Sequence, residues 1–238
     1  MKKIVLFIMA FVLVGIHYGF SFGIQEYGNG DIITIDRTIS SSFDGIHLET
    51  GATVNLYQNP EQKISITVDS NIEKFIQTEI KNGILDIKYW NGYNRPTQNI
   101  INIYTPGIQS IAISGSGTIV IADKITTDSL KTHISGSGEI EGPVECDTLA
   151  ISIFGSGDIK LNGRSREAEI SISGSGDVVC DKLQVNNADI RISGSGAVLI
   201  DVADNLKGRI FGSGNILYLG TPRINFRASG SGKISILK

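Results

Sequence analysis

Residues 151–179 read ISIFGSGDIKLNGRSREAEISISGSGDVV. This stretch holds two Gly-Ser-Gly triplets 19 residues apart, each flanked by alternating apolar and polar residues. The triplet occurs seven times, beginning at Gly115, Gly136, Gly155, Gly174, Gly194, Gly212 and Gly230, with spacings of 21, 19, 19, 20, 18 and 18 residues. A nearly constant period of about 20 residues is typical of solenoids, in which each repeat buries its apolar face against its neighbours.

Apolar columns accompany the triplets. Two residues after each triplet the side chain is always β-branched: Ile119, Ile140, Ile159, Val178, Val198, Ile216 and Ile234. Two residues before it lie Ile113, Ile134, Ile153, Ile172, Ile192, Ile210 and Ala228, and a third column is formed by Leu130, Leu149, Ala168, Ala188, Leu206 and Ile224. Alternation with a period of two predicts strands, so each repeat is expected to hold several short strands joined by turns.

The triplet suits a sharp corner, because glycine reaches positive φ without a Cβ penalty and a small serine lets consecutive corners stack about 4.8 Å apart. The sequence therefore predicts an all-β, parallel β-helix over residues 111–238, right-handed by the general rule for parallel crossovers. An antiparallel sandwich or propeller is disfavoured, since hairpins rarely repeat one turn composition so regularly.

Residues 24–110 lack the triplet but contain short alternating runs at 46–49, 53–58, 63–68, 84–89 and 100–104. Asn82-Gly83 between two of these runs is a hairpin signal. Only 71–81 suggests a helix, and its β-branched content argues against one. We expect a β-rich N-terminal region packed on the solenoid or continuous with it.

Residues 1–23 begin with Met-Lys-Lys, continue with an apolar run and end in small residues, the layout of a secretory signal peptide. The run is too short for a permanent membrane span, so export to the periplasm, cell surface or medium is expected. Without this segment the net charge is 19 − 24 = −5, which disfavours nucleic acid as a partner.

Several motifs together resemble the family named "putative auto-transporter adhesin, head GIN domain" of Gram-negative envelopes. They are residues 43–46 (FDGI), 54–58 (VNLYQ), 82–87 (NGILDI) and 103–106 (IYTP), together with the Ser-Gly-Ser-Gly repeats. The resemblance implies an exported β-helical protein and suggests adhesion, and it transfers no catalytic residue.

The repeats offer little sign of catalysis. The middle serines lack the spacing of a nucleophile elbow, and only His47 and His133 remain outside the signal segment. The residue after each triplet is acidic in three consecutive coils, at Glu139, Asp158 and Asp177. These carboxylates could form a cation site or an acidic catalytic set, but a solvated polar edge is the favoured interpretation. We expect no catalytic residues and no cofactor.

Cys146 and Cys180 fall two coils apart and at different points of their coils. Two coil spacings exceed the roughly 7 Å Cα separation that a disulfide allows, so two free thiols are expected. Two unaligned cysteines and one or two histidines do not form a zinc cage, so no metal site is expected.

The segment 89–96 holds the only tryptophan, Trp90, together with Tyr93 and Arg95 in a turn-rich stretch. Aromatic side chains beside an arginine are typical of sugar or protein recognition, whereas a buried tryptophan would indicate a plug that covers the end of the solenoid core. Exposure of Trp90 distinguishes these two interpretations.

The first hypothesis is thus a non-enzymatic exported binding or adhesion module, whose partner is a polysaccharide or another component of the envelope or host surface. A polysaccharide-active enzyme on the same scaffold would need carboxylates, lysines and arginines clustered in a groove. A third hypothesis is a self-associating envelope scaffold whose end coils pair between chains, although Lys233 and Lys238 oppose such pairing.

Overall fold

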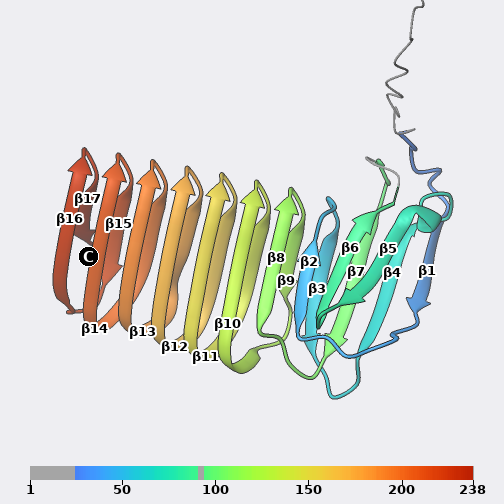
Figure 1. Cartoon of the computed structure of the whole chain (residues 1–238), viewed down its shortest axis with the longest axis horizontal. Coiled ribbons are helices and arrows are strands. Elements are labelled where there is room, and N and C mark those ends of the chain that lie inside the picture. The colour runs from blue at the N-terminus through green and yellow to red at the C-terminus, as the bar shows by residue number, and fades with distance from the viewer. Residues whose placement is uncertain (1–24, 91–93, 238) are drawn as a thin grey trace, which may run out of the picture.

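The computed structural model describes residues 25–90 and 94–237, so the expected signal peptide and Tyr93 lie outside the described residues. The chain forms a parallel β-solenoid whose coils stand in a row (Figure 1). Its strands are β1 (Ile32–Arg37), β2 (Gly45–Leu48), β3 (Thr53–Gln58), β4 (Lys63–Asp69), β5 (Ile76–Lys81), β6 (Ile84–Tyr89), β7 (Asn99–Thr105), β8 (Ser110–Gly115), β9 (Thr118–Ile121), β10 (Ile125–Gly136), β11 (Glu139–Gly155), β12 (Asp158–Gly174), β13 (Asp177–Gly194), β14 (Ala197–Gly212), β15 (Asn215–Leu219), β16 (Arg223–Gly230) and β17 (Lys233–Ile236). One 3-10 turn, η1 (Glu73–Phe75), precedes β5.

The repeats differ from the prediction in one respect. Strands β11 to β14 are each 16 to 18 residues long and run from one triplet to the next without a break. The expectation of several short strands with turns is wrong there, because parallel pairing with the neighbouring coil continues from one triplet to the next. Register shifts near Lys160 and between Cys180 and Asn187 interrupt the register without ending the strands.

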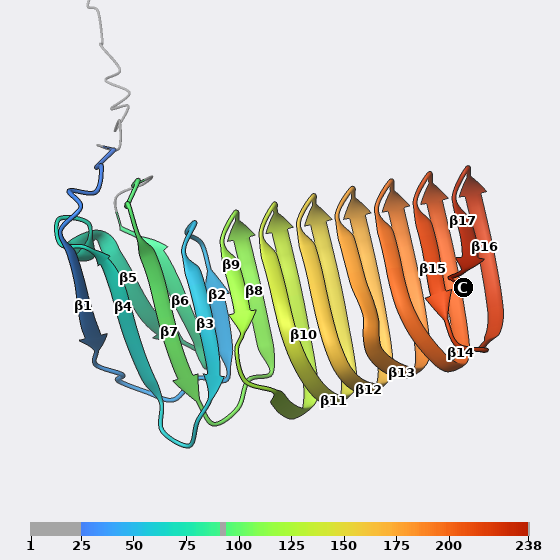
Figure 2. The same cartoon turned by 180° about the vertical axis from the view of Figure 1, so that it is seen from behind.

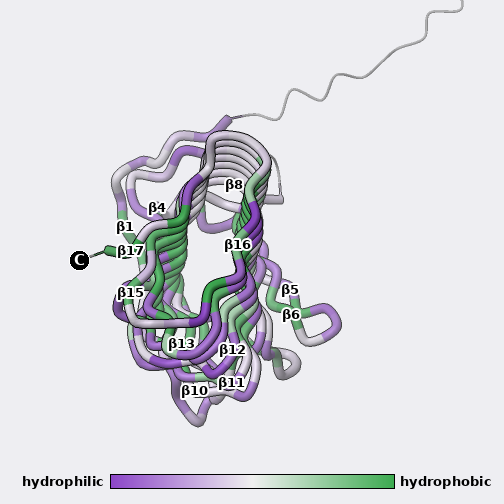
Figure 3. Tube along the Cα trace, turned by 90° about the vertical axis from the view of Figure 1, so that its left-hand side faces the viewer, coloured by the Kyte–Doolittle hydropathy of each residue, from purple (hydrophilic) through white to green (hydrophobic). Residues whose placement is uncertain are grey.

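The predicted apolar columns form the core except at the last coil, where Ile224 and Ala228 are exposed and Ile234 is half-buried. Ile113, Ile134, Ile153, Ile172, Ile192 and Ile210 are buried, as are the β-branched residues that follow the first six triplets. Seen along the solenoid axis, apolar residues run as bands along the coils, and the strands enclose the interior between them (Figure 3). Each buried side chain packs on its counterpart one coil away, which is why one residue type recurs at each position.

The triplets are corners, as predicted. At Gly174 φ is +133°, and a Cβ atom there would lie 2.2 Å from the carbonyl oxygen of Gly155 in the preceding corner. The backbone N–H of Ser175 donates to that same oxygen at 2.8 Å. The glycine is therefore required both by its backbone conformation and by the close approach of the next coil.

The region before residue 111 shares the sheets of the solenoid, but its coils are out of sequence order. Strand β2 lies between β6 and β8, and β3 lies between β7 and β9, all in parallel pairs. Figures 1 and 2 show this insertion from both sides. Beyond it, β4 pairs antiparallel with β7 and β1. The predicted turn at Asn82 and Gly83 joins β6 in a hairpin to β5, a strand that was not expected from the sequence.

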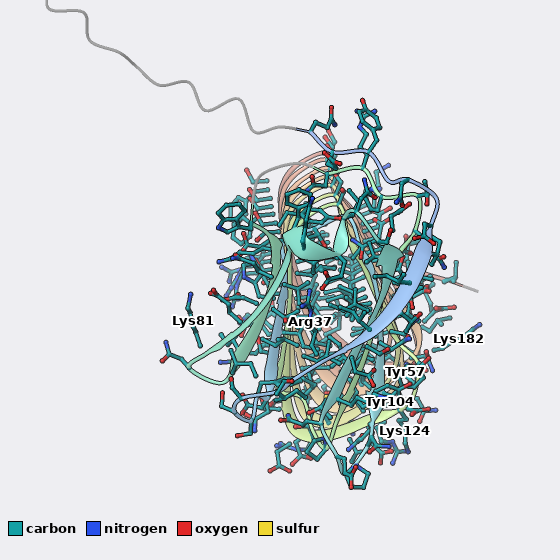
Figure 4. All side chains as sticks on the ribbon, turned by 90° about the vertical axis from the view of Figure 1, so that its right-hand side faces the viewer. Arg37, Tyr57, Lys81, Tyr104, Lys124 and Lys182 are labelled. Atoms are coloured by element: carbon teal, nitrogen blue, oxygen red, sulfur yellow. The ribbon has the colours of Figure 1, made fainter. Side chains whose placement is uncertain are left out.

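The N-terminal end of the core is covered by β1 and η1 (Figure 4). Arg37 forms an ion pair with Glu73 at 2.8 Å and donates to the carbonyl oxygens of Glu73 and Ile76. Segment 71–81 is thus a short turn followed by a strand rather than a helix. Within 25–90 and 94–237 the structure contains no helix of the length and apolarity that crossing a membrane requires.

Candidate functional site

A hollow of about 600 Å³ lies at the corner end of the N-terminal coils. Four separate chain segments line it, namely 49–51 after β2, 88–89 at the end of β6, 94–96 before β7 and the first corner at 115–116. These segments meet because the three N-terminal coils turn at the same end of the solenoid. The volume falls within the range of about 300–1,000 Å³ that is usual for small-ligand sites. We call it the Trp90 hollow, after the residue beside it.

Trp90 directly follows Tyr89 of the hollow wall and is 67% exposed. Its backbone N–H donates to the carbonyl oxygen of Phe75, which holds the chain in place while the indole faces solvent. Of the two interpretations drawn from the sequence, exposure favours recognition over a plug.

Arg95 and Asn94 line the hollow. The Arg95 guanidinium lies 5.8 Å from the ring of Tyr27, within reach of a cation–π contact, and the two backbones are bridged. Asn94 is only 4% exposed, and among the described residues neither its amide nitrogen nor its amide oxygen has a hydrogen-bond partner. Buried amides are normally satisfied, so Asn94 is an exception, but both of its amide atoms are closed off from solvent and do not face a ligand in this conformation.

Asp69 fastens the chain segments next to the hollow. Its carboxylate accepts hydrogen bonds from Gly30 N–H at 2.8 Å, and from the hydroxyl and N–H of Thr97, both at 2.7 Å. Burial raises the pKa of Asp69, but the bonds from Thr97, Gly30 and Gln98 outweigh it and hold the pKa below its ordinary value. The ionised carboxylate thereby links the N-terminal segment to the loop that contains Arg95.

A histidine-centred cluster lies on the adjoining sheet surface. His47 of β2 stands opposite Asp86 of β6, and its Nδ1 lies 3.0 Å from Asp86 Oδ1 and 3.7 Å from Glu49 Oε1. On the other side, Nε2 lies 2.9 Å from Ser114 Oγ of β8. Glu49 also lines the Trp90 hollow, so the cluster and the hollow share a wall.

Glu139, Asp158 and Asp177 lie opposite one another on successive coils, as expected from their spacing. Glu139 pairs with Lys160 at 2.6 Å, while the other two carboxylates accept backbone N–H groups of the next coil, from Asp177 at 3.2 Å and Ala197 at 2.8 Å. The carboxylates are thus used in binding neighbouring coils together, which accords with a polar edge rather than a cation site.

Cys146 and Cys180 are buried free thiols. Burial raises the pKa of Cys180 to about 12 and raises that of Cys146 as well. Thiolates are therefore scarce at neutral pH, and neither side chain is suited to act as a nucleophile.

A second concavity, the axial groove, was not found from the sequence. It has a volume of about 490 Å³ and crosses β10 to β14, with Ala168 and Ala188, which lie opposite each other, among its small residues and Glu169, Asp189 and Lys207 among its charged ones. The signal was present in the small residues that recur one coil apart, but a column of alanines looks the same whether it faces the core or a groove.

The His47 cluster was also missed, because its members are separated by 39 and 67 residues and only the inserted coil brings them together.

A family model described as "Putative auto-transporter adhesin, head GIN domain" matches residues 42–222. The chain belongs to this family. The resemblance identified from the sequence motifs is therefore confirmed.

Solved structures with the same fold include a putative adhesin from Bacteroides fragilis, with a TM-score of 0.81, 24% identity, and coverage of 89% of this chain and 99% of that one. A protein from Parabacteroides distasonis described as a putative lipid binding protein has a TM-score of 0.75 and 26% identity, with coverage of 90% of this chain and 100% of that one. A putative adhesin from Parabacteroides merdae has a TM-score of 0.70 and 25% identity, with coverage of 90% of this chain and 99% of that one. No curated protein matches the chain.

Proposed function

We propose that this protein is an exported, non-enzymatic adhesion module that binds a polysaccharide or a related component of an envelope or host surface. Membership of the adhesin-like family supports a binding role, and the layout of residues 1–23 supports export. The ligand contacts would come from the Trp90 hollow, with Trp90 and Arg95 as the principal side chains.

The observation that carries this proposal is the exposed indole of Trp90, which is next in the chain to Tyr89 of the hollow wall. Sugars present apolar C–H faces that stack on aromatic rings and hydroxyl groups that need donors and acceptors. Tyr89 in the hollow wall and the exposed Trp90 that follows it offer aromatic rings, and Lys88 and Arg95 add hydrogen-bond donors and positive charge for an acidic sugar. Exposed aromatic and arginine side chains commonly provide most of the binding energy at recognition surfaces.

A polysaccharide-active enzyme is the second candidate, and the axial groove is the observation that favours it, because carboxylates and cations gather there. Glu169 and Asp189 both form ion pairs with Arg191, and Asp189 also pairs with Lys207 at 2.6 Å. A general acid and base pair needs two carboxyl groups of opposed protonation. Carboxylates held by cations in this way are better suited to organising the groove than to proton transfer.

The test is to pass the purified protein over a panel of immobilised bacterial and host polysaccharides, measuring retention and the release of new chain ends together. We expect retention without cleavage. Trp90→Ala should weaken retention at least tenfold, equivalent to about 1.4 kcal/mol. Phe211→Ala is the matched control, because Phe211 is an aromatic residue of similar exposure, 60%, outside the hollow.

New chain ends would overturn the non-enzymatic assignment and direct attention to the axial groove. Retention that is insensitive to Trp90→Ala but lost in Asn187→Ala, which alters the groove lining, would move the binding site to the groove. A panel with no retained polymer would refute polysaccharide as the ligand.

A further inference from the structure

We propose that His47, Glu49 and Asp86 form a binding site for a divalent transition-metal ion of the Zn²⁺ type. Among the described residues, these three offer one imidazole nitrogen and two carboxylate oxygens that all lie within 4.8 Å of one another. Imidazole together with carboxylate is a common donor set for Zn²⁺, whereas Ca²⁺ and Mg²⁺ prefer oxygen ligands alone.

The distances suit a single ion. Ligand atoms bound at about 2.0–2.2 Å to a tetrahedral Zn²⁺ lie roughly 3.4 Å from one another. The distances from His47 Nδ1 to Asp86 Oδ1 and Glu49 Oε1, 3.0 and 3.7 Å, lie on either side of that value. Side-chain rotations that bring the Glu49 and Asp86 oxygens, which lie within 4.8 Å of each other, to a similar spacing would complete the coordination.

Ser114 fixes the imidazole ring in the required orientation. Its Oγ lies 2.9 Å from His47 Nε2, the nitrogen that faces away from the two carboxylates. When that nitrogen carries the proton and donates to Ser114, Nδ1 keeps its lone pair for the metal. Such an outer hydrogen bond is the usual companion of a metal-bound histidine. Because a hydroxyl can accept as well as donate, it holds the ring in place while the proton on Nδ1, next to Asp86, gives way to the metal and Nε2–H donates to Ser114.

The site also joins separate parts of the N-terminal region. His47 and Glu49 belong to the inserted coil, whereas Asp86 belongs to β6, the strand that leads into Trp90. All three side chains remain partly open to solvent, with 21–39% exposure, so an ion can enter and keep a water or ligand in a further position. Because Glu49 also lines the Trp90 hollow, the bound ion would lie at its edge. The metal site does not depend on the proposed adhesion function.

The chain provides its own control at His133. Its Nδ1 lies 2.8 Å from Ser152 Oγ, so this imidazole also has a serine partner on the same face of the solenoid. It stands beside Phe154 and is not part of the three-ligand group. A histidine that binds metal only because it is accessible would do so equally well at either position.

The experiment is a calorimetric titration of the purified, chelator-treated protein with Zn²⁺ alone, repeated with Co²⁺ while the visible absorption is recorded. We expect one ion per chain. His47→Gln and Asp86→Asn should each weaken the affinity at least tenfold, Ser114→Ala about tenfold through loss of the orienting bond, and His133→Gln should leave it unchanged. Circular dichroism of each variant establishes that it is folded, and Asp86→Asn is an independent test if His47→Gln fails to fold.

Absence of stoichiometric Zn²⁺ binding would overturn the proposal. So would equal affinity in folded His47→Gln and the native protein, or loss of binding in His133→Gln. Because none of these readouts involves a polysaccharide, failure of the metal site and failure of the adhesion function can be distinguished.

Discussion

Alanine substitutions of four glycines can separate the two reasons why the corners need glycine. Gly174 has both a positive φ of +133° and a neighbouring carbonyl oxygen 2.2 Å from the position of an added Cβ. Gly115 has a positive φ of +115° but no atom within 4 Å, because no earlier triplet stacks beneath it. At Gly176 an added Cβ would lie 2.2 Å from the Gly157 carbonyl oxygen, but φ is not positive, and Gly107 has neither feature.

The expected losses of stability follow from these differences. A non-glycine residue held in a sparsely populated backbone region costs about 1–3 kcal/mol, which is the whole effect expected for Gly115→Ala. In Gly174→Ala the clash must also open the corner and weaken the bond from Ser175 N–H to Gly155, at a further cost of about 0.5–1.5 kcal/mol for that bond. Gly176→Ala should show the packing penalty alone, and Gly107→Ala should change the free energy of unfolding by less than about 0.5 kcal/mol.

The assay is urea denaturation of the purified variants, followed by circular dichroism of the strands. The predicted order of destabilisation is Gly174→Ala largest, then Gly115→Ala and Gly176→Ala, then Gly107→Ala. If Gly115→Ala were as damaging as Gly174→Ala, close stacking of neighbouring corners would not be the reason for the repeated glycine. If Gly115→Ala were silent, the backbone argument would fail instead.

Three further predictions concern single side chains. Because the pKa of Asp69 is lower in the folded state than in the unfolded state, its contribution to stability is complete above the unfolded value and is lost as pH falls through the folded one. Asp69→Asn should therefore reduce stability near neutral pH by about 1–3 kcal/mol. In urea denaturation measured between pH 2 and 7, the midpoint concentration of the variant should fall less steeply towards acid pH than that of the native protein, and an equally steep fall would contradict this. In the folded protein at pH 8, Cys180 should resist alkylation by iodoacetamide and react more slowly than Cys146, with both reacting in urea; modification of Cys180 within minutes would refute the burial argument. Tyr57 stacks on Tyr104 with ring centroids 4.8 Å apart (Figure 4), so thermal unfolding should show Tyr57→Phe close to the native protein and Tyr57→Leu less stable by about 0.5–1.5 kcal/mol, and equal stability of the two variants would count against the stack.

The solenoid was predictable because its physical requirements repeat. A coil can bury Ile153 only against Ile134 and Ile172, so each repeat constrains the residues of the next. Backbone conformation adds a second constraint at each corner, and the two together leave a pattern that is visible in the sequence. The length of β11 to β14 was not visible in the same way, because Gly142 and Gly163 look like turn residues and have positive φ, although the pairing with the neighbouring coil continues through them.

The inserted N-terminal coil could not be predicted, because strand order there is decided by packing between segments that lack a shared motif. The motif around Val54 and the one around Ile103 are both typical of strands, but neither indicates that β3 lies between β7 and β9. The stacking of Glu139 on Asp158 followed directly from the period. The contacts of His47 did not, as they depend on which strands the insertion places side by side.

This contrast bears on where function resides in the molecule. Within the regular repeats, a position is surrounded by its own counterparts one coil away, so a new chemical group usually meets the same few neighbours. At the N-terminal end, β2 and β3 are inserted between strands from other parts of the chain. Asp86 of β6, His47 of β2 and Ser114 of β8 come together there. The same arrangement places Glu49, Lys88 and Arg95 around one hollow. Chemical variety is therefore greatest where the coil order departs from the sequence order, and the regular coils act as the rigid support on which that end is presented.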